Sequence, residues 1–343
     1  MSGKILLYIP SVAKVVGGGV ATQAQMTAKY AQNGSKEIVL YNPWLEYDWS
    51  EFSAVHIFRA DYETHNFAKV VAEKGIPIIL SSIFFSSHSP SRIRALTGGL
   101  NQFRKLFSGV RSDFDFVKEV CDLATIILPN TQEEANLLSA SFGIESSKFR
   151  VVPNGVSTEF YMADRDLFYK EFGLRDFTLT VANLGFKRKN MLGALKALKS
   201  SSVTYVIIGP LYDNDYGIAC KEIIDSCDNI HYLGAMANDS PLLASAYANA
   251  KVFLLPSLFE TPGIAAMEAA LAGAEVVITQ NGGTKEYFGE YAHYIDPKSQ
   301  SSIREAVKIA NSSTPLSPQK HILKNYTWER VGEITANIYD GFL

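Results

Sequence analysis

Two glutamates, Glu260 and Glu268, frame the start of a predicted helix and are the acids best placed to do chemistry. Thr261 suits the N-cap of this helix and Pro262 its first position, and Gly273 suits the residue just after its end. The helix is otherwise almost wholly apolar, so an unpaired carboxylate at Glu268 would be costly. The pattern therefore predicts two carboxylates that flank one site at the helix N-terminus.

The N-terminus of this helix is predicted to bind an anion. The backbone amides of Gly263 and Ile264 have no acceptor within the helix, so they could hold a phosphate or pyrophosphate without a metal ion. A carboxylate does not attract a phosphate, so Glu260 and Glu268 are predicted to accept hydrogen bonds from hydroxyls, as on sugar rings. The alternative stays open that Glu260 is an exposed loop acid and Glu268 a solvated helix residue.

A second candidate anion site is the glycine-rich turn 17–19, which follows the first apolar strand and opens a helical pattern. Gly18 and Gly19 would let the backbone approach a ligand closely. The turn does not fit G-x-G-x-x-G, because the third glycine would fall at Thr22, so a nicotinamide-type site is not indicated. A tight turn without any ligand is the alternative.

Short apolar runs alternate with amphipathic stretches along the whole chain, which predicts an α/β protein with parallel sheets covered by helices on both faces. The strands are expected at 4–9, 37–41, 54–58, 77–81, 124–128, 149–152, 177–182, 204–208, 230–233, 251–255, 275–278 and 292–295. Two doubly wound domains are predicted, 1–158 with the return of a last helix at 327–343, and 159–326. Ligands are expected at the carboxyl ends of the strands, in a cleft between the domains.

The composition argues against several classes of protein, namely nucleic-acid-binding, disulfide-rich and membrane-spanning proteins. The chain has 343 residues with 32 Lys and Arg against 35 Asp and Glu, so it lacks the basic excess that bulk nucleic-acid binding needs. Three cysteines without C-x-x-C spacing indicate free thiols in a reducing compartment rather than disulfides or structural zinc. No uncharged apolar stretch reaches membrane-spanning length and no signal peptide is apparent, so a cytoplasmic protein is expected.

The segment with the two glutamates resembles the Glu, seven residues, Glu motif of the retaining family 4 glycosyltransferases. Those enzymes belong to the glycosyl transferases group 1 and have the GT-B fold of two facing Rossmann-like domains. The resemblance covers most of the chain, and its other segments are 152–156, 207–210, 231–234, 281–286 and 326–329. It implies transfer of a sugar from a nucleotide donor to a hydroxyl, with retention at the anomeric carbon.

The resemblance also implies roles for the residues around the motif. Lys189 would neutralise the donor's diphosphate. Glu268 would take the ribose hydroxyls, and Glu260 would hold the donor sugar and phosphates together with the backbone of 261–264.

Further residues would complete this donor site. Gly209 and Leu233 would lie near the base, and Gly18 and Gly19 would face the diphosphate from the first domain. No metal ion or other cofactor is implied. Asp213-Asn-Asp215 matches the D-x-D metal motif of another fold and is interpreted as a surface loop.

Two departures from the family pattern bear on catalysis. Asn183 stands where an arginine is usual, and Arg188 could supply the missing charge. Ser82 stands where many relatives carry a histidine, and His88 could act there only if its loop folds back.

The segment 86–112 is basic and amphipathic, with Arg92, Arg94, Arg104, Lys105 and Arg111 and no acid before Asp113. Such a segment can rest on anionic lipid, which would suit a lipid-linked acceptor and peripheral contact with a membrane. A helix packed on the first domain with solvated charges is the alternative.

The leading hypothesis is a retaining hexosyltransferase that uses a UDP-sugar and a saccharide or lipid-linked acceptor, in polysaccharide or glycolipid biosynthesis. Attack from the same face as the leaving phosphate is favoured, because no residue is identifiable as a carboxylate nucleophile on the opposite face. The alternatives are a sugar-nucleotide hydrolase or epimerase of the same fold, and a glycosyltransferase-like binding partner without turnover.

Overall fold

The computed structural model describes residues 3–10, 18–33, 37–99 and 111–342. The chain divides into two compact units, Met1–Gly155 with Trp328–Leu343, and Val156–Thr327. The first unit thus ends before the predicted residue 158. The reason is that the Val156 amide donates to the Tyr326 carbonyl at 2.8 Å, and Phe160 is buried in the core of the second unit.

The first unit contains a parallel sheet of order β2-β1-β3-β4-β5. Its strands are β1 (Lys4–Tyr8), β2 (Glu37–Leu40), β3 (Phe52–Phe58), β4 (Ile78–Ser81) and β5 (Ile126–Ile127). The strand expected at 149–152 does not form, because only Phe149 makes a bridge, to Ile127, and Pro153 then ends the pairing.

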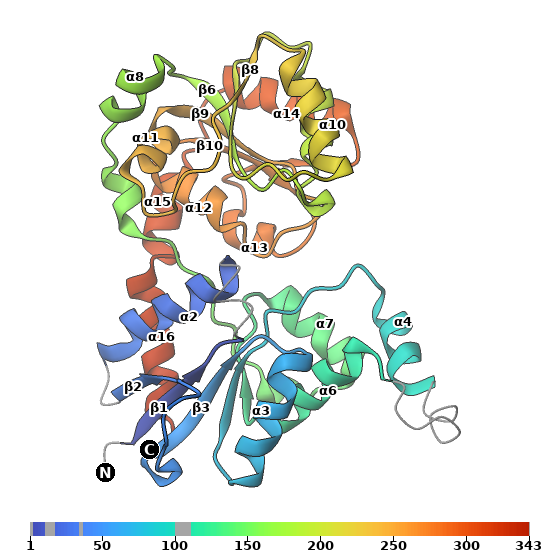
Figure 1. The fold of residues 1–343 in the computed structure, drawn as a ribbon, viewed down its shortest axis with the longest axis vertical. Coiled ribbons are helices and arrows are strands. Elements are labelled where there is room, and N and C mark those ends of the chain that lie inside the picture. Colours follow the sequence, from blue (N-terminus) through green and yellow to red (C-terminus); the bar gives the residue numbers. More distant parts are fainter. Residues whose placement is uncertain (1–2, 11–17, 34–36, 100–110, 343) are drawn as a thin grey trace. The chain divides into compact units, whose positions relative to one another are not determined.

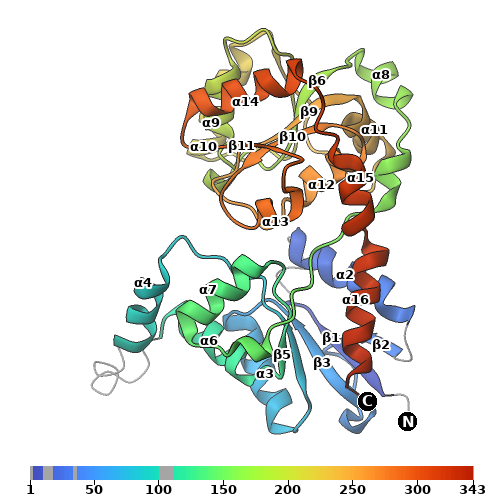
Figure 2. The ribbon, with the colours of Figure 1, turned by 180° about the vertical axis from the view of Figure 1, so that it is seen from behind.

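Helices cover both faces of this sheet. Its helical segments are α2 (Gly19–Tyr30), η1 (Ala31–Asn33), η2 (Trp49–Glu51), α3 (Tyr62–Glu73), α4 (Pro90–Arg94), η3 (Ala95–Gly99), α6 (Asp113–Leu123), α7 (Gln132–Phe142), η4 (Ser146–Lys148) and α16 (Trp328–Asp340). Apolar side chains of α2 and α16 pack on one face, and those of α3, α6 and α7 on the other. Helices α2 and α16, from opposite ends of the chain, lie side by side (Figures 1 and 2).

The second unit contains a parallel sheet of order β11-β10-β9-β6-β7-β8. Its strands are β6 (Phe177–Val181), β7 (Tyr205–Ile208), β8 (Ile230–Tyr232), β9 (Ala250–Leu255), β10 (Glu275–Thr279) and β11 (His293–Ile295). Each lies within about two residues of the run predicted for it, because most residues of these strands are apolar and buried.

The helical segments of the second unit are η5 (Thr158–Met162), α8 (Asp166–Phe172), η6 (Lys187–Lys189), α9 (Met191–Leu198), α10 (Asp215–Asp225), α11 (Pro241–Asn249), α12 (Ile264–Leu271), α13 (Thr284–Phe288), α14 (Gln300–Ser312) and α15 (Pro318–Asn325). One face of the sheet is covered by α8, α11, α12, α13 and α15, and the other by α9, α10 and α14. The α/β class predicted from the alternating pattern is confirmed.

The basic segment 86–112 is described in part. Ile93 on α4 is fully buried in the core of the first unit, while Arg92 and Arg94 are exposed. Arg104 and Lys105 lie outside the described residues, so contact with lipid stays a prediction. Among the described residues, no helix combines the length and apolar character needed to cross a bilayer.

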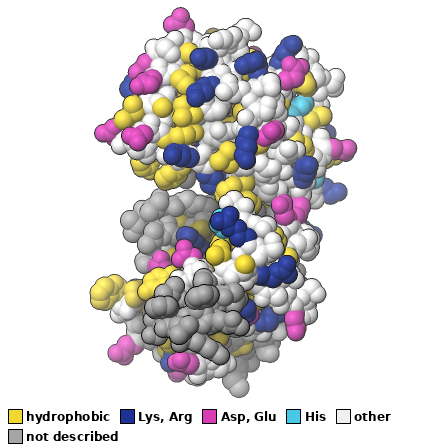
Figure 3. Space-filling view, turned by 90° about the vertical axis from the view of Figure 1, so that its right-hand side faces the viewer, with side chains coloured by type: hydrophobic (Ala, Val, Ile, Leu, Met, Phe, Trp, Pro, Cys, Tyr) yellow, Lys and Arg dark blue, Asp and Glu magenta, His cyan; other side chains and the backbone are white. Residues whose placement is uncertain are grey.

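One face of the second unit carries dispersed charges. On the face shown in the upper half of Figure 3, Lys and Arg side chains lie interleaved with Asp and Glu rather than in one stripe. Such a surface does not favour the release of counterions that drives nucleic-acid binding.

Candidate active site

The candidate site of the second unit is built from loops that leave the carboxyl ends of β6, β9 and β10. The Leu258 amide donates to the Arg188 carbonyl at 2.8 Å, which ties the β9 loop to the β6 loop. The Glu260 amide donates to the Asn281 carbonyl at 3.1 Å, and Asn281 Nδ2 donates to the Leu258 carbonyl at 3.0 Å. The three loops therefore hold one another in place.

Glu260 is the centre of this site. The residue is 7% exposed, and its Oε1 accepts hydrogen bonds from Lys189 Nζ at 2.6 Å, Ser257 Oγ at 2.6 Å and Arg188 Nη1 at 3.2 Å. Burial alone would raise the pKa of Glu260, but the charges of Lys189 and Arg188 outweigh it and lower the pKa. Glu260 is thus an ionised carboxylate held between two cations.

The two cations are presented by a tight turn. Asn190 follows η6 with φ +53°, and its Nδ2 donates to the carbonyls of Pro256 at 3.0 Å and Pro297 at 2.6 Å. The Lys189 side chain is 20% exposed and that of Arg188 is 42% exposed. Both cations therefore remain within reach of a ligand's phosphates.

Helix α12 begins later than the sequence pattern predicts. The expected cap at Thr261 and first helical position at Pro262 are wrong, because the N-cap is Gly263, with φ +85°. A Cβ there would lie 2.9 Å from Leu255 Cδ2, so this left-handed, closely packed position requires glycine. Ile264 is the first residue of α12, so its amide lacks an intrahelical acceptor, as predicted. Gly273 follows the helix end as expected, with φ +101°.

Glu268 lies on α12 and is half-buried. Its Oε2 accepts a hydrogen bond from Tyr247 Oη at 2.8 Å. Burial raises the pKa of Glu268 to about 7, and the charge of Glu159 adds to this, while the Tyr247 hydroxyl opposes it. Glu268 therefore holds a proton more readily than Glu260, whose pKa is lowered.

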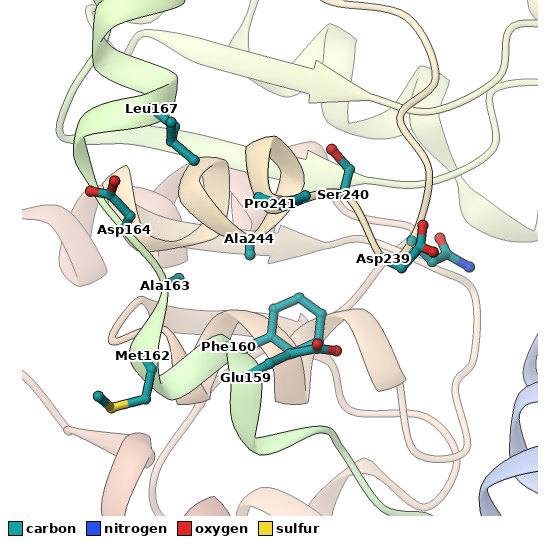
Figure 4. Close-up of a pocket in the computed structure, with 11 residues that line it drawn as sticks. Glu159, Phe160, Met162, Ala163, Asp164, Leu167, Asp239, Ser240, Pro241 and Ala244 are labelled. Carbon is teal, nitrogen blue, oxygen red and sulfur yellow. The ribbon is translucent and has the colours of Figure 1, made fainter.

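A pocket of about 220 Å³ lies between η5 and the N-terminus of α11 (Figure 4). Its lining residues are Glu159, Phe160, Met162, Ala163, Asp164, Leu167, Asn238, Asp239, Ser240, Pro241 and Ala244. The ring of Phe160 also packs edge-on against Tyr247, with centroids 5.6 Å apart. The pocket therefore adjoins the Tyr247–Glu268 pair.

The predicted neighbours of the base, Gly209 and Leu233, lie at the carboxyl ends of β7 and β8 and do not line this pocket. A Cβ on Gly209 would lie 1.9 Å from the Ala182 carbonyl oxygen, so no side chain fits there. The Leu233 amide donates a hydrogen bond to the Ile207 carbonyl at 3.0 Å. Asn183, which stands where an arginine is usual, uses its Oδ1 to accept from the Gly185 amide at 2.9 Å.

The remaining predicted residues belong to the first unit. Gly18 is the N-cap of α2 with φ +100°, and Gly19 is the first residue of that helix. Ser82 is fully buried and donates to Glu134 Oε1 at 2.6 Å, so its hydroxyl is not available to a substrate. His88 lies before α4, with its ring 6.0 Å from that of Phe114.

The structure thus brings Glu260, Lys189 and Arg188 together and places Glu268 on the helix that follows Glu260. Sequence reasoning missed Ser257 and Tyr247, which supply hydroxyl donors to the two glutamates. Ser257 could have been found by its place just past a strand end. In the sequence Tyr247 looks like a core residue of an apolar helix. Its hydrogen bond to Glu268 becomes visible only when α11 is packed against α12.

Metal independence stays a prediction. In the described part of the chain, no three His, Cys, Asp or Glu side chains gather closely enough to hold a metal ion. Asp213 and Asp215 lie exposed around Asn214, whose side chain caps α10 through the Gly217 amide. The cysteines Cys121, Cys220 and Cys227 are free thiols.

Residues 169–327 match the family described as Glycosyl transferases group 1. A protein of Methanocaldococcus jannaschii described as an uncharacterized glycosyltransferase is 25% identical over 240 residues, which cover 64% of this chain and 60% of that protein. The chain spans about half the length of the curated relatives it matches, namely 60%, 47% and 43% of the three.

Two solved structures share the whole fold. The sucrose-phosphate synthase of Thermosynechococcus elongatus has a TM-score of 0.75 at 13% identity, covering 99% of both chains. HepE of Anabaena, in complex with UDP, has a TM-score of 0.70 at 16% identity, covering 98% of this chain and 100% of that one. The likeness confirms the GT-B fold class, with two Rossmann-like units.

Proposed function

Because residues 169–327 match the family described as Glycosyl transferases group 1, we propose that this chain is a retaining glycosyltransferase that moves a hexose from a nucleotide-sugar to a hydroxyl. The observation that carries the proposal is the cluster of Glu260 with Lys189 and Arg188 beside the N-terminus of α12. A nucleoside diphosphate needs cations and free amides for its phosphates, and carboxylates for its hydroxyls. This cluster offers all of these groups within one set of loops.

In the proposed site the two cations change partners when the donor binds. Lys189 and Arg188 neutralise Glu260 in the free protein, and a diphosphate would compete for them. Glu260, partly released, would then accept hydrogen bonds from hydroxyls of the donor sugar. The amides at the start of α12 would hold the phosphates from the helix end.

The chemical step is a substitution with retention. The bond between the anomeric carbon and the phosphate oxygen breaks, and the acceptor oxygen bonds to the same face of that carbon. The acceptor's hydroxyl proton passes to the leaving phosphate oxygen. The protein contributes position and charge, through Lys189 and the α12 amides, rather than a strong base.

We propose UDP as the nucleotide and a saccharide or lipid-linked hydroxyl as the acceptor, in polysaccharide or glycolipid assembly. The UDP assignment is supported by fold neighbours solved with UDP, and with UDP and glucose. Glu268 would accept from the ribose hydroxyls. The reaction needs no metal ion in this proposal, and the protein acts in the cytoplasm, with segment 86–112 available for peripheral contact with a membrane.

Calorimetric binding of UDP, GDP, ADP and CDP in the presence of EDTA tests the site. One nucleotide should bind without metal, and Glu268→Gln should weaken it about tenfold, because an amide accepts poorly from two ribose hydroxyls. The matched control is Glu290→Gln, an exposed acid whose loss should change affinity less than twofold.

The outcomes separate the alternatives. If no nucleotide binds, the site assignment fails. If a nucleotide binds but no sugar donor is turned over with or without acceptors, the chain is a binding partner. If the donor is hydrolysed or epimerised and no acceptor accelerates its consumption, the chain is a hydrolase or epimerase of this fold.

A further inference from the structure

Two residues at neighbouring strand ends of the first unit adopt a backbone conformation that side chains disfavour. Arg59, directly after β3, has φ +75°, and Ile83, just after β4, has φ +45°. A left-handed φ is uncommon for any residue with a side chain, and for a β-branched residue it is an outlier. Such residues persist only where the surroundings fix them, and they gather at ligand sites.

A buried carboxylate fixes these strand ends. Glu134 on α7 is 3% exposed, and its Oε1 accepts from Ser82 Oγ at 2.6 Å and from the Phe84 amide at 2.7 Å, on either side of Ile83. Its Oε2 accepts from the Asn130 amide at 2.9 Å. One side chain thus anchors the loops after β4 and β5.

The same anchor extends to Arg59. The Arg59 amide donates to the Ser81 carbonyl at 2.7 Å, and the Ala60 amide donates to the Ser82 carbonyl at 3.1 Å. Because Glu134 holds Ser82, the backbone that presents Arg59 rests on that carboxylate. The loop after β3, residues 59–63, is therefore held in place by hydrogen bonds, and we call this segment the platform.

The platform carries donor, acceptor and aromatic groups side by side. Arg59 Nε pairs with Asp61 Oδ2 at 3.0 Å, while Asp61 Oδ1 accepts from the Thr64 amide at 3.0 Å. The Arg59 side chain is 49% exposed, and Tyr62 is 63% exposed. A guanidinium has further N–H groups in a fixed plane, so this pair can donate to one hydroxyl and accept from another.

The charge of the platform selects against anions. Residues 59–63 contain one guanidinium against the carboxylates of Asp61 and Glu63. A phosphate would meet two like charges and a cation that is already paired, whereas a neutral polyol meets both donors and acceptors. The position, at the carboxyl end of a parallel sheet, is where such folds bind ligands.

We propose that Arg59 contacts the acceptor and selects a neutral saccharide, and that Glu134 is the positioning residue that holds it. This inference rests on the proposed function and names the acceptor class for it. Binding of the donor remains assigned to the groups of the second unit.

The test compares Arg59→Ala and Arg59→Lys with a matched control, Arg175→Ala. Arg175 is 47% exposed and pairs with Asp166 at 3.3 Å on the second unit, so its loss removes a similar surface ion pair. The acceptors are neutral p-nitrophenyl hexosides and the corresponding hexose 6-phosphates. The donor is the glucose ester of the nucleoside diphosphate that calorimetry selects, which is UDP-glucose if UDP binds.

For Arg59→Ala we expect the KM of the neutral acceptor to rise at least tenfold, with the donor KM and donor hydrolysis without acceptor unchanged. Arg59→Lys should recover little, because a point charge lacks the planar fork. The control should stay within twofold. An unchanged acceptor KM in Arg59→Ala, or a wild-type preference for phosphorylated acceptors that this variant abolishes, would overturn the proposal.

Glu134→Gln tests the positioning role. It should raise the acceptor KM about fivefold while donor hydrolysis and nucleotide affinity stay unchanged, a split that general loss of folding does not produce. Equal losses toward donor and acceptor would overturn this role. Saturation-transfer NMR with neutral methyl hexosides measures contact with Arg59 even if no donor is turned over. Loss of that signal in Arg59→Ala supports the saccharide site, and an unchanged or absent wild-type signal contradicts it.

Discussion

Each unit keeps one nearly buried carboxylate at the carboxyl edge of its sheet, and the two are held in opposite ways. Glu260 is held by Lys189 and Arg188, which are side-chain cations that can turn to another anion. Glu134 accepts from the amides of Phe84 and Asn130, which are part of the backbone. A carboxylate with exchangeable partners suits a binding event, whereas one that holds backbone amides serves as scaffold.

The largest expected effect is the loss of catalysis on replacing Lys189. Lys189→Ala removes the closest cation to Glu260 and to the proposed diphosphate, so kcat should fall at least a hundredfold, or about 3 kcal/mol of transition-state stabilisation. Steady-state kinetics measures this. Lys187→Ala, an exposed neighbour in η6, is the control and should stay within twofold. A loss in Lys189→Ala no larger than that in the control would mean that Glu260 and its cations have a structural role, as Glu134 has.

The second effect is on the stability of the first unit. Glu134→Ala should lower the free energy of unfolding by about 3 kcal/mol, because buried amides and the Ser82 hydroxyl lose their acceptor. Urea unfolding measures it, with Glu133→Ala on the exposed side of α7 as the control. A loss below about 0.5 kcal/mol would contradict the scaffold role.

The third effect is a pH dependence at Glu268. The free protein keeps a proton there below about pH 7, and ribose hydroxyls donate to the ionised form, so nucleotide binding releases the proton. Affinity should therefore rise up to tenfold per unit as pH increases toward 7 and then level off. Calorimetry in buffers of different ionisation enthalpy measures the proton released.

Tyr247→Phe sharpens this prediction. Its hydroxyl favours the ionised carboxylate, so its loss should move the midpoint to higher pH, while Glu268→Gln should remove the dependence altogether. A midpoint that does not move in Tyr247→Phe would show that another group titrates.

The smallest expected effect is the fall in kcat/KM on replacing Arg188. Its side chain is more exposed than that of Lys189 and lies 3.2 Å from Glu260, so solvent screens it more strongly. Arg188→Ala should lower kcat/KM only about three- to tenfold. A loss as large as that of Lys189→Ala would show that Arg188 carries the charge that Asn183 lacks.

Local signals predicted most of the fold. Strands such as Tyr205–Ile208 are buried on both faces and therefore read as uninterrupted apolar runs. The strand expected at 149–152 falls short because Arg150 and Val152 donate to the carbonyls of Ile127 and Pro129, but Pro153 has no amide hydrogen with which to continue the ladder. The helix start predicted at Pro262 is wrong. The fixed φ of proline suits a first helical position, but the close packing against Leu255 requires glycine at the N-cap one residue later.

The resemblance singled out residues in the second unit that the structure brings together, and it singled out no such pair in the first unit. Glu260 and Lys189 are residues to which the resemblance gives roles, and their side chains are in contact. The left-handed φ of Arg59 and Ile83 cannot be predicted from the sequence, because their conformation depends on hydrogen bonds that the Glu134 carboxylate, far along the chain, accepts from Ser82 and Phe84. The buried state of Ser82 depends on the same contact.

The place of α16 has a consequence for the order in which the protein forms. This last helix belongs to the first unit, where Tyr339 Oη lies 2.6 Å from Nδ1 of the buried His56. A ribosome therefore releases every residue of the second unit before it delivers the helix that completes the first. The first unit can therefore complete its core only after the whole second unit has been synthesised, and until then α2 covers that face of the sheet without α16.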